Sequence, residues 1–142
     1  MKKLLATATI LSMAISMSPA FATGAIAVAE PNDVARDGYS SGISYNFKTD
    51  AEAEDRALRE CQNSQDAPPA TRQLCKHIRT FRDQCVAVSL DPQAGTPGAG
   101  WAIADTLAGA RREATQRCEE TAGRDRQGEC RVTAEGCDGR AK

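Results

Sequence analysis

The chain contains one histidine, His77, and it lies close to a cysteine, Cys75. Alternate residues of an extended strand point to the same face, so the Cys75 thiolate and the His77 imidazole would form a nucleophile–base pair. That chemistry requires a free thiol. An even number of cysteines in an exported chain is typical of complete disulfide pairing, which would remove the nucleophile. We therefore expect His77 to be a surface or packed residue rather than a general base.

The beginning of the chain predicts a secretory signal peptide over residues 1–22. Two lysines precede an apolar run that ends near Met17, and a small-x-small cleavage site ends at Ala22. An uncleaved membrane anchor is the competing interpretation, because the uncharged span is long enough to cross a bilayer. Pro19 and the many small residues favour cleavage. Residues 23–142 would then form one mature domain in the periplasm or outside the cell.

Cleavage after Ala22 would expose Thr23 as the first residue of the mature chain. An N-terminal threonine can use its own amine as the base that activates its hydroxyl. The sequence supplies no evident oxyanion site to accompany this nucleophile. A small secreted enzyme that uses Thr23 or His77 is therefore our alternative hypothesis.

A short segment in the middle of the chain concentrates positive charge. Its members are Arg72, Lys76, His77, Arg79 and Arg82. Strand alternation predicts that His77 and Arg79 share one face and that Lys76 lies on the other. Cations on an exposed edge strand commonly block unwanted strand pairing. The alternative is that these cations form a positively charged surface that binds another protein with an acidic surface.

Aromatic side chains are scarce, at 4% of the residues. Tyr39 and Tyr45 have the amphipathic rings that often anchor protein contacts, so both belong to the candidate binding site. Trp101 and Phe47 are more typical of the core in a chain with so few large residues.

Two similar helices organise the elements that position these side chains. The segment from Thr49 to Cys61 is repeated from Thr106 to Cys118, with threonine, alanine and cysteine at matching positions. A threonine before an alanine-rich run with helical spacing predicts a capped helix that packs closely on a sheet. Glu52 completes a capping box in the first copy, so we expect its first turn to be the more stable one.

Short apolar segments surround both helices and predict strands. They cover residues 24–29, 39–47 and 74–81 in the first copy, and residues 85–89, 100–104 and 130–134 in the second. Each copy is thus strand, strand, helix, strand, over about residues 24–84 and 85–138. The prediction is an α+β fold in which two helices pack on one side of a mainly antiparallel sheet.

Six cysteines follow the predicted leader, and six cysteines permit 15 pairings. The repeat narrows this choice. Cys61 and Cys75 flank the loop after the helix in the first copy, and Cys118 and Cys130 flank the equivalent loop in the second. Cys85 and Cys137 remain, and they lie at equivalent places at the ends of the two copies. The predicted bridges are Cys61–Cys75, Cys118–Cys130 and Cys85–Cys137, and we expect the third to join the two copies. A metal site is disfavoured, since the chain has no Cys-x-x-Cys pair and one histidine. We expect no cofactor.

The formal net charge is −1, and loss of the two leader lysines makes the mature chain more acidic. A protein that binds nucleic acid in bulk is normally basic, so this class is disfavoured. After cleavage we also expect no stable insertion into a membrane.

Several motifs occur together along the chain. They are Gly24-Ala-Ile-Ala-Val28, Tyr45-Asn46-Phe47, the helix from Thr49 to Cys61 with its Ala-Glu-Ala-Glu run, Cys85-Val-Ala-Val88 and Gly100-Trp101. In combination they resemble the bacterial family known as domain of unknown function 4189, over roughly residues 24 to 137. The resemblance implies export and a disulfide-containing repeat, and it brings no established reaction.

Export, disulfide staples and the lack of a catalytic constellation favour a non-catalytic binding module of the bacterial envelope. An inhibitor, an immunity-type protein or a secreted interaction factor would fit this description. The expected partner is another protein, recognised through the basic segment and the two tyrosines.

Overall fold

The computed structural model of the chain describes residues 22–142. The predicted signal peptide therefore lies outside the described residues, apart from Ala22. The first strand, β1, begins at Thr23, the residue that follows the expected cleavage site. None of the helices in this part of the chain is long and apolar enough to cross a membrane.

The chain folds into two halves with a similar order of elements. The first half contains β1 (Thr23–Ala29), α1 (Val34–Asp37), β2 (Ser40–Phe47), α2 (Asp50–Asn63), α3 (Pro69–Arg72) and β3 (Lys76–Phe81). The second half contains β4 (Cys85–Leu90), β5 (Ala99–Ala104), α4 (Leu107–Ala122), the 3-10 turn η1 (Arg124–Arg126) and β6 (Arg131–Cys137). Each half forms an antiparallel sheet, in the orders β2-β1-β3 and β5-β4-β6. The α+β class and the duplicated strand-strand-helix-strand unit are confirmed.

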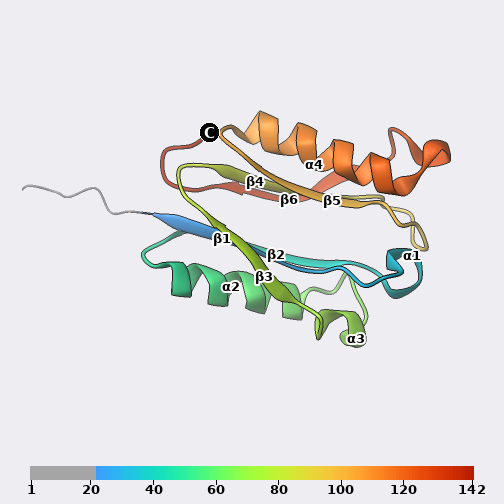
Figure 1. Ribbon diagram of the computed structural model, residues 1–142, viewed down its shortest axis with the longest axis horizontal. Coiled ribbons are helices and arrows are strands. Elements are labelled where there is room, and N and C mark those ends of the chain that lie inside the picture. The colour runs from blue at the N-terminus through green and yellow to red at the C-terminus, as the bar shows by residue number, and fades with distance from the viewer. Residues whose placement is uncertain (1–21) are drawn as a thin grey trace, which may run out of the picture.

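The six strands form two sheets, whereas the sequence suggested one. Figure 1 shows the sheets stacked face to face, with α2 outside the first sheet and α4 outside the second. The physical reason is that both faces of each middle strand are apolar. β1 packs Ile26 and Val28 against the other sheet and Ala25 and Ala27 against α2. Both faces therefore need cover, which one helical layer cannot provide.

Side-chain size differs between the layers. Ile26, Val86 and Val88 are fully buried or nearly so between the sheets, where Phe81 joins them. Alanines line both helix–sheet interfaces, as the alanine-rich pattern predicts. The small residues allow each helix to lie close to its sheet.

Two strand glycines make this close approach possible. A Cβ atom on Gly42 would collide with the backbone carbonyl of Ala57 in α2, and one on Gly100 would collide with that of Ala114 in α4. Because backbone cannot move aside cheaply, we expect Gly42→Ala and Gly100→Ala each to cost about 1–3 kcal/mol of stability. Urea unfolding of the purified variants measures this. Unchanged midpoints would show that the helices do not rest on these strands.

Both long helices begin with the threonine cap that the repeat predicts. The Thr49 hydroxyl accepts a hydrogen bond from the Glu52 N–H at 3.2 Å, and the Thr106 hydroxyl accepts one from Gly109 at 3.1 Å. The cap bond is therefore present in both copies. The second helix still lacks the acidic first-turn residues that the helix dipole favours.

The segment between Cys61 and Cys75 is not the featureless loop expected from its composition. It contains α3, which begins at Pro69, where proline has no N–H to lose and already has a helical φ. β3 consequently begins at Lys76, later than predicted. In the second half β6 continues to Cys137, beyond its predicted end.

A β-bulge changes the faces of the basic segment. Arg79 pairs with Ile26 and His77 pairs with Ala27, so Ile78 is an extra residue. Directly opposite residues in a sheet share a face. His77 therefore lies on the α2 side and Arg79 on the side of the other sheet. The prediction that the two share a face is wrong, because alternation fails at the bulge.

All six cysteines are paired, in the three bridges predicted from the repeat. Two bridges each tie a long helix to the residue before the last strand of its half. The third differs from expectation, because Cys85 and Cys137 face each other in neighbouring strands of the second sheet. It staples that sheet and does not join the two halves. Three disulfides in a domain of this size are typical of an oxidising environment outside the cytoplasm.

The two halves are joined at one end by the carboxylate of Asp138, which is fully buried. It accepts a hydrogen bond from the Asn46 N–H at 2.7 Å and a longer one from the Asp83 N–H at 3.4 Å. Asn46 and Asp83 have φ values of 62° and 49°, in the left-handed region that Asn and Asp tolerate best after glycine. Asn46 lies near the end of β2, and Asp83 lies in the connection to the second sheet. The Asp138 side chain thus links both segments, in addition to the core between the sheets.

Candidate binding pocket

A pocket of about 680 Å³ opens at the end of the molecule away from the C terminus, and we call it the loop-end pocket. Both halves form its walls, through α1 and the start of β2 on one side and the end of β4 with the β4–β5 loop on the other (Figure 1). Val34, Pro68, Leu90 and Pro92 supply apolar surface. The lining also contains polar residues, and the volume lies in the range of small-molecule sites.

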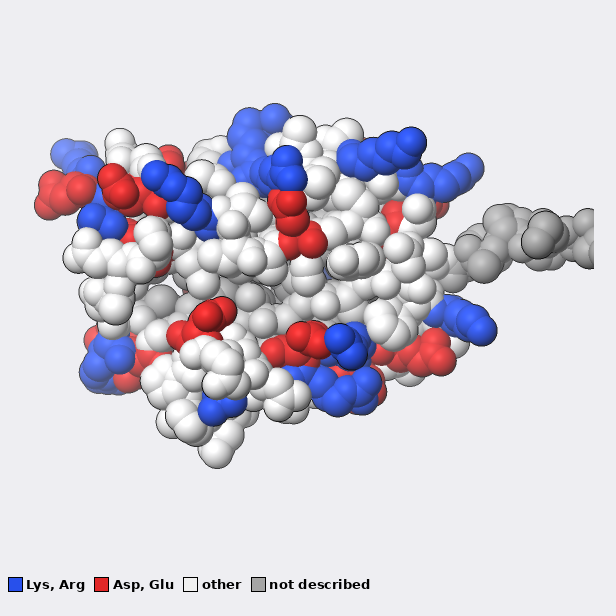
Figure 2. All heavy atoms as spheres, turned by 180° about the vertical axis from the view of Figure 1, so that it is seen from behind, with Lys and Arg blue, Asp and Glu red and all other residues white. Residues whose placement is uncertain are grey.

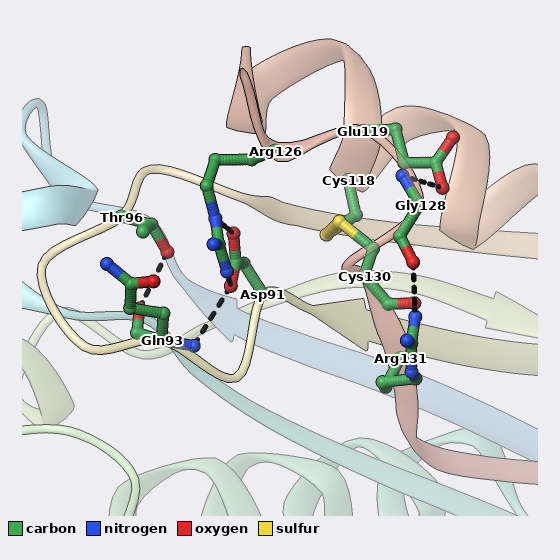
Figure 3. Close-up of polar contacts among 9 residues, drawn as sticks. All are labelled: Asp91, Gln93, Thr96, Cys118, Glu119, Arg126, Gly128, Cys130 and Arg131. Carbon is green, nitrogen blue, oxygen red and sulfur yellow. Dashed lines mark hydrogen bonds and ion pairs between the residues drawn. A yellow bond between two sulfur atoms is a disulfide. The ribbon is translucent and has the colours of Figure 1, made fainter. Parts of the chain in front are cut away.

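The β4–β5 loop forms the rim of the pocket and is held by a buried ion pair (Figure 3). The Asp91 side chain is fully buried, and Arg126 donates two hydrogen bonds to its carboxylate at 2.8 and 2.7 Å. Asp91 also accepts a hydrogen bond from the Gln93 N–H at 2.9 Å, and its own N–H donates to the Gly98 carbonyl across the loop. The guanidinium lowers the pKa of Asp91 to about 2.

Arg126 is itself anchored by the segment that follows α4. The Cys118–Cys130 bridge ties this segment to the helix, and Glu119 accepts a hydrogen bond from the Gly128 N–H at 3.1 Å (Figure 3). The Arg131 guanidinium donates to the Gly128 carbonyl at 2.6 Å. The rim is therefore built on the disulfide of the second half.

The Asp91–Arg126 pair makes the rim sensitive to acid. The pKa of Asp91 is about 2 in the folded protein, against an ordinary value of 3.8. A carboxyl group whose pKa is lowered by folding stabilises the folded state above the unfolded pKa, and this stabilisation is lost as the pH falls through the folded pKa. We expect the thermal midpoint to fall between about pH 4 and pH 2, and less so in Arg126→Gln. Scanning fluorimetry of both proteins tests this, and identical pH profiles would contradict it.

Tyr39 lies in the wall of the loop-end pocket and is 5% exposed. Its hydroxyl is buried and has no hydrogen-bond partner among residues 22–142. Burial, with a smaller effect of the Glu30 carboxylate, raises the pKa of Tyr39 above its usual range. A buried hydroxyl without a partner costs about 1–3 kcal/mol. Tyr39 is thus not the surface anchor expected from its type, but a core residue next to a cavity.

Tyr45 is more exposed than the two aromatic residues that the sequence assigns to the core. Tyr45 is 43% exposed, and its ring covers Gly136 of the second half. Phe47 packs against the cluster under α2, and Trp101 against the core between the sheets, each partly buried. The Arg117 guanidinium lies over the Trp101 ring, 5.8 Å from its centre.

The cations of the basic segment differ in whether they have a charged partner. The Arg82 guanidinium lies 2.5 Å from Asp50, and the His77 Nε2 atom lies 3.9 Å from the Glu54 carboxylate. Arg72 donates to the Gln62 carbonyl at 3.4 Å. Two further cations, Lys76 and Arg79, are exposed and form no ion pair within the described part of the chain. On the face drawn in Figure 2, charges of both signs are interspersed.

The two residues considered for catalysis lie apart from each other and in different settings. Thr23 is 1% exposed, and its hydroxyl donates to Asp50 at 2.9 Å. His77 has no thiol nucleophile beside it, because Cys75 is bonded to Cys61. In this arrangement the Thr23 hydroxyl is occupied and closed to a substrate.

Sequence reasoning did not find the loop-end pocket. Asp91 and Pro92 follow the strand predicted over residues 85–89, and Arg126 lies between the predicted second helix and the last strand, so neither position indicated a pocket. The sequence signal for the Asp91–Arg126 pair was weak, because two oppositely charged residues that lie so far apart in sequence give no indication that they are in contact. The pocket depends on how the halves stack, which the strand pattern leaves open.

Three comparisons with known proteins complete the description. The curated proteins contain no match to this chain. Among solved structures, the chain is similar to the NMR structure of Rv1813c from Mycobacterium tuberculosis, with 17% identity and a TM-score of 0.46, over 96% of this chain and 97% of that one. The family described as Domain of unknown function (DUF4189) matches residues 23–137. Since this match covers most of the sequence, the chain belongs to the DUF4189 family.

Proposed function

We propose that the protein is an exported, non-catalytic binding module of the bacterial envelope that holds its ligand in the loop-end pocket. The observation that carries this proposal is a pocket formed by both halves, with a rim that the Asp91–Arg126 pair holds in place. Rigid walls favour binding, because little ordering remains to be done when the ligand arrives.

Export is the part of the proposal that rests on the sequence and the disulfides together. The first strand of the described residues begins at Thr23, and the family match begins at the same residue. We propose that the mature protein starts there and works in the periplasm or the surrounding medium. Mass spectrometry of protein recovered from these fractions tests this directly, and intact Met1 in the membrane fraction would contradict it.

The alternative of a small secreted enzyme has less support. Catalysis by Thr23 would require its buried hydroxyl to leave Asp50, and catalysis by His77 would require a nucleophile from the substrate or water. Assays of the mature protein against peptidoglycan, peptide and ester substrates separate the two hypotheses. Turnover that is lost in His77→Ala or Thr23→Val would overturn the binding proposal.

Two variants test whether the pocket is the binding site. Ala94 is exposed on the rim, so Ala94→Trp should fill the entrance without disturbing the core. Ala51 is equally exposed on α2, far from the pocket lining, and Ala51→Trp is the matched control. After incubation with an envelope extract and gel filtration, native mass spectrometry should show a bound molecule on the wild type and on Ala51→Trp. If Ala94→Trp also retains the bound molecule, the binding site lies elsewhere on the protein.

A second candidate is a protein partner with an acidic surface, such as the target of an inhibitor or immunity-type protein. The observation in its favour is that Lys76 and Arg79 are exposed, without ion pairs among residues 22–142, and on the same side of β3 by register. Such binding should weaken with salt and disappear in the Lys76→Glu/Arg79→Glu double variant. Arg112→Glu, an exposed cation on α4, is the control.

A further inference from the structure

The outer edge of β3 is open in the described part of the chain. β3 is the last strand in the order β2-β1-β3, so only one of its two edges pairs with a neighbouring strand. Among residues 22–142, no side chain or loop forms a hydrogen bond with the strand backbone from Lys76 to Thr80, apart from the pairing with β1. Unpaired N–H and C=O groups along an edge are a template to which another extended segment can add.

An edge strand of the second half, β5, shows how this protein closes an edge. The Thr121 hydroxyl on α4 accepts a hydrogen bond from the Ala99 N–H at 3.0 Å and lies 3.0 Å from the Ala99 carbonyl. Arg117, on the same helix, donates to the Trp101 carbonyl at 2.8 Å. Side chains of α4 therefore occupy the main-chain groups of β5, and β3 has no comparable cover within the described residues.

Exposed cations accompany the open edge of β3. Lys76 and Arg79 lie opposite core residues of β1, so both stand on the face turned toward the second sheet. Both are exposed and form no ion pair among residues 22–142. The other face of β3 is different, because His77 lies there with its Nε2 atom 3.9 Å from the Glu54 carboxylate. The unpaired positive charge is thus confined to one face of the strand.

This distribution of charge selects the segment that can add. If a second copy of β3 paired antiparallel along the same edge, the Lys76 and Arg79 side chains of both copies would meet on one face, and like charges in that position are destabilising. A strand with carboxylates on that face would instead form opposite-charge pairs. On the other face, Glu54 would repel a carboxylate. The complementary strand therefore carries its acidic residues at alternate positions.

We propose that the open edge of β3 binds an extended acidic segment of another protein by strand addition, with carboxylates at alternate positions beside Lys76 and Arg79. Main-chain hydrogen bonds hold the segment, and the two cations select its sequence. This inference rests on the second candidate function, because it states how the acidic partner is held. β3 contributes no residue to the lining of the loop-end pocket, so the two sites are separate.

Synthetic peptides separate strand addition from simple charge attraction. The probe is a fluorescently labelled peptide in which glutamate alternates with threonine, and binding is measured by anisotropy at low salt. Two further peptides carry N-methyl groups on alternate residues, one on every glutamate and the other on every threonine. Only alternate residues of an added strand bond to the edge, so one methylated peptide should lose about ten-fold in affinity and the other should bind like the probe.

Variants of the protein locate the site. Lys76→Glu/Arg79→Glu should abolish binding of the probe, and Arg112→Glu, which changes an exposed cation on α4, should not. Amide NMR shifts on addition of the probe should follow β3. Shifts along β2, β5 or β6 would overturn the assignment of the edge.

The outcomes distinguish this inference from the second candidate function. Equal affinities for the probe and both methylated peptides, with binding still lost in Lys76→Glu/Arg79→Glu, would refute strand addition and leave the basic surface standing. Binding that is insensitive to salt and unchanged in the double variant would refute both. Failure of the probe to bind, while an acidic protein binds and depends on Lys76 and Arg79, would refute strand addition alone.

Discussion

Reducing all three disulfides is expected to unfold the protein at room temperature. On the chain-entropy account, a bridge that closes about 15 residues contributes roughly 3 kcal/mol, and one that closes about 50 residues contributes roughly 4 kcal/mol. The separations here are 14, 12 and 52 residues. The total, roughly 10 kcal/mol, is comparable with the whole stability of a typical domain, about 5–15 kcal/mol.

Circular dichroism with and without a phosphine reductant measures this effect, with thiol alkylation and mass spectrometry to confirm complete reduction. The double variant Cys85→Ser/Cys137→Ser should cost the most of the three pairs, roughly 4 kcal/mol. Since this bridge lies inside the second sheet, hydrogen exchange should accelerate in β4 and β6 before it does in β1. Cooperative unfolding that survives full reduction would contradict this expectation.

Asp138→Ala is expected to lower the free energy of unfolding by about 2–5 kcal/mol, although the substitution removes no disulfide. The substitution removes two partly buried hydrogen bonds from the Asn46 and Asp83 N–H groups to a carboxylate, and a hydrogen bond to a charged group contributes about 1.5–3 kcal/mol. These two residues also hold positive φ values that the carboxylate helps to maintain. Urea unfolding at neutral pH measures the change.

Two further variants make the Asp138 test specific. Asp138→Asn keeps one acceptor oxygen, so its stability should lie between those of the wild type and Asp138→Ala. Asp125→Ala removes an exposed carboxylate from η1 and should change stability by less than about 0.5 kcal/mol. Equal midpoints for Asp138→Ala and Asp125→Ala would show that the halves are held together without this contact.

The long helices and the bridges were predictable from the sequence because their signals are local. Thr49 and Thr106 mark helix starts by type, and alanines at helical spacing mark the buried face, so neighbours along the chain determine the structure. The repeat then restricted the cysteines to one arrangement, which the structure confirms. The role of Cys85–Cys137 was not predictable, since it depends on which strands lie side by side.

The division into two sheets was harder to predict from the sequence, for a physical reason. Ile26 and Val28 alternate with alanines along β1, and this pattern says that both faces are buried without saying by what. The bulge at Ile78 also has no recognisable signal in the sequence, yet it places His77 and Arg79 on opposite faces of the sheet. A matching bulge occurs in the second half, between Val88 and Ser89, so the distortion belongs to the repeated unit.

The candidate site shows the limit of reasoning from residue type. Tyr39 was identified from its chemistry, but its burial and its free hydroxyl come from the stacking of the halves. The basic segment suggested a charged surface, and the structure pairs Arg82 with Asp50 while Lys76 and Arg79 form no ion pair within residues 22–142. Long-range packing therefore decides both which candidate residues are available and where a ligand can enter.

A titration of isotope-labelled protein with the molecule recovered from the envelope extract, followed by amide NMR shifts, tests most directly whether the loop-end pocket is the binding site. We predict that the shifts concentrate in α1, at Tyr39 and in the loop from Asp91 to Gly98, and that they vanish in Ala94→Trp. Shifts along β3 at Lys76 and Arg79, or shifts that persist unchanged in Ala94→Trp, would contradict the account.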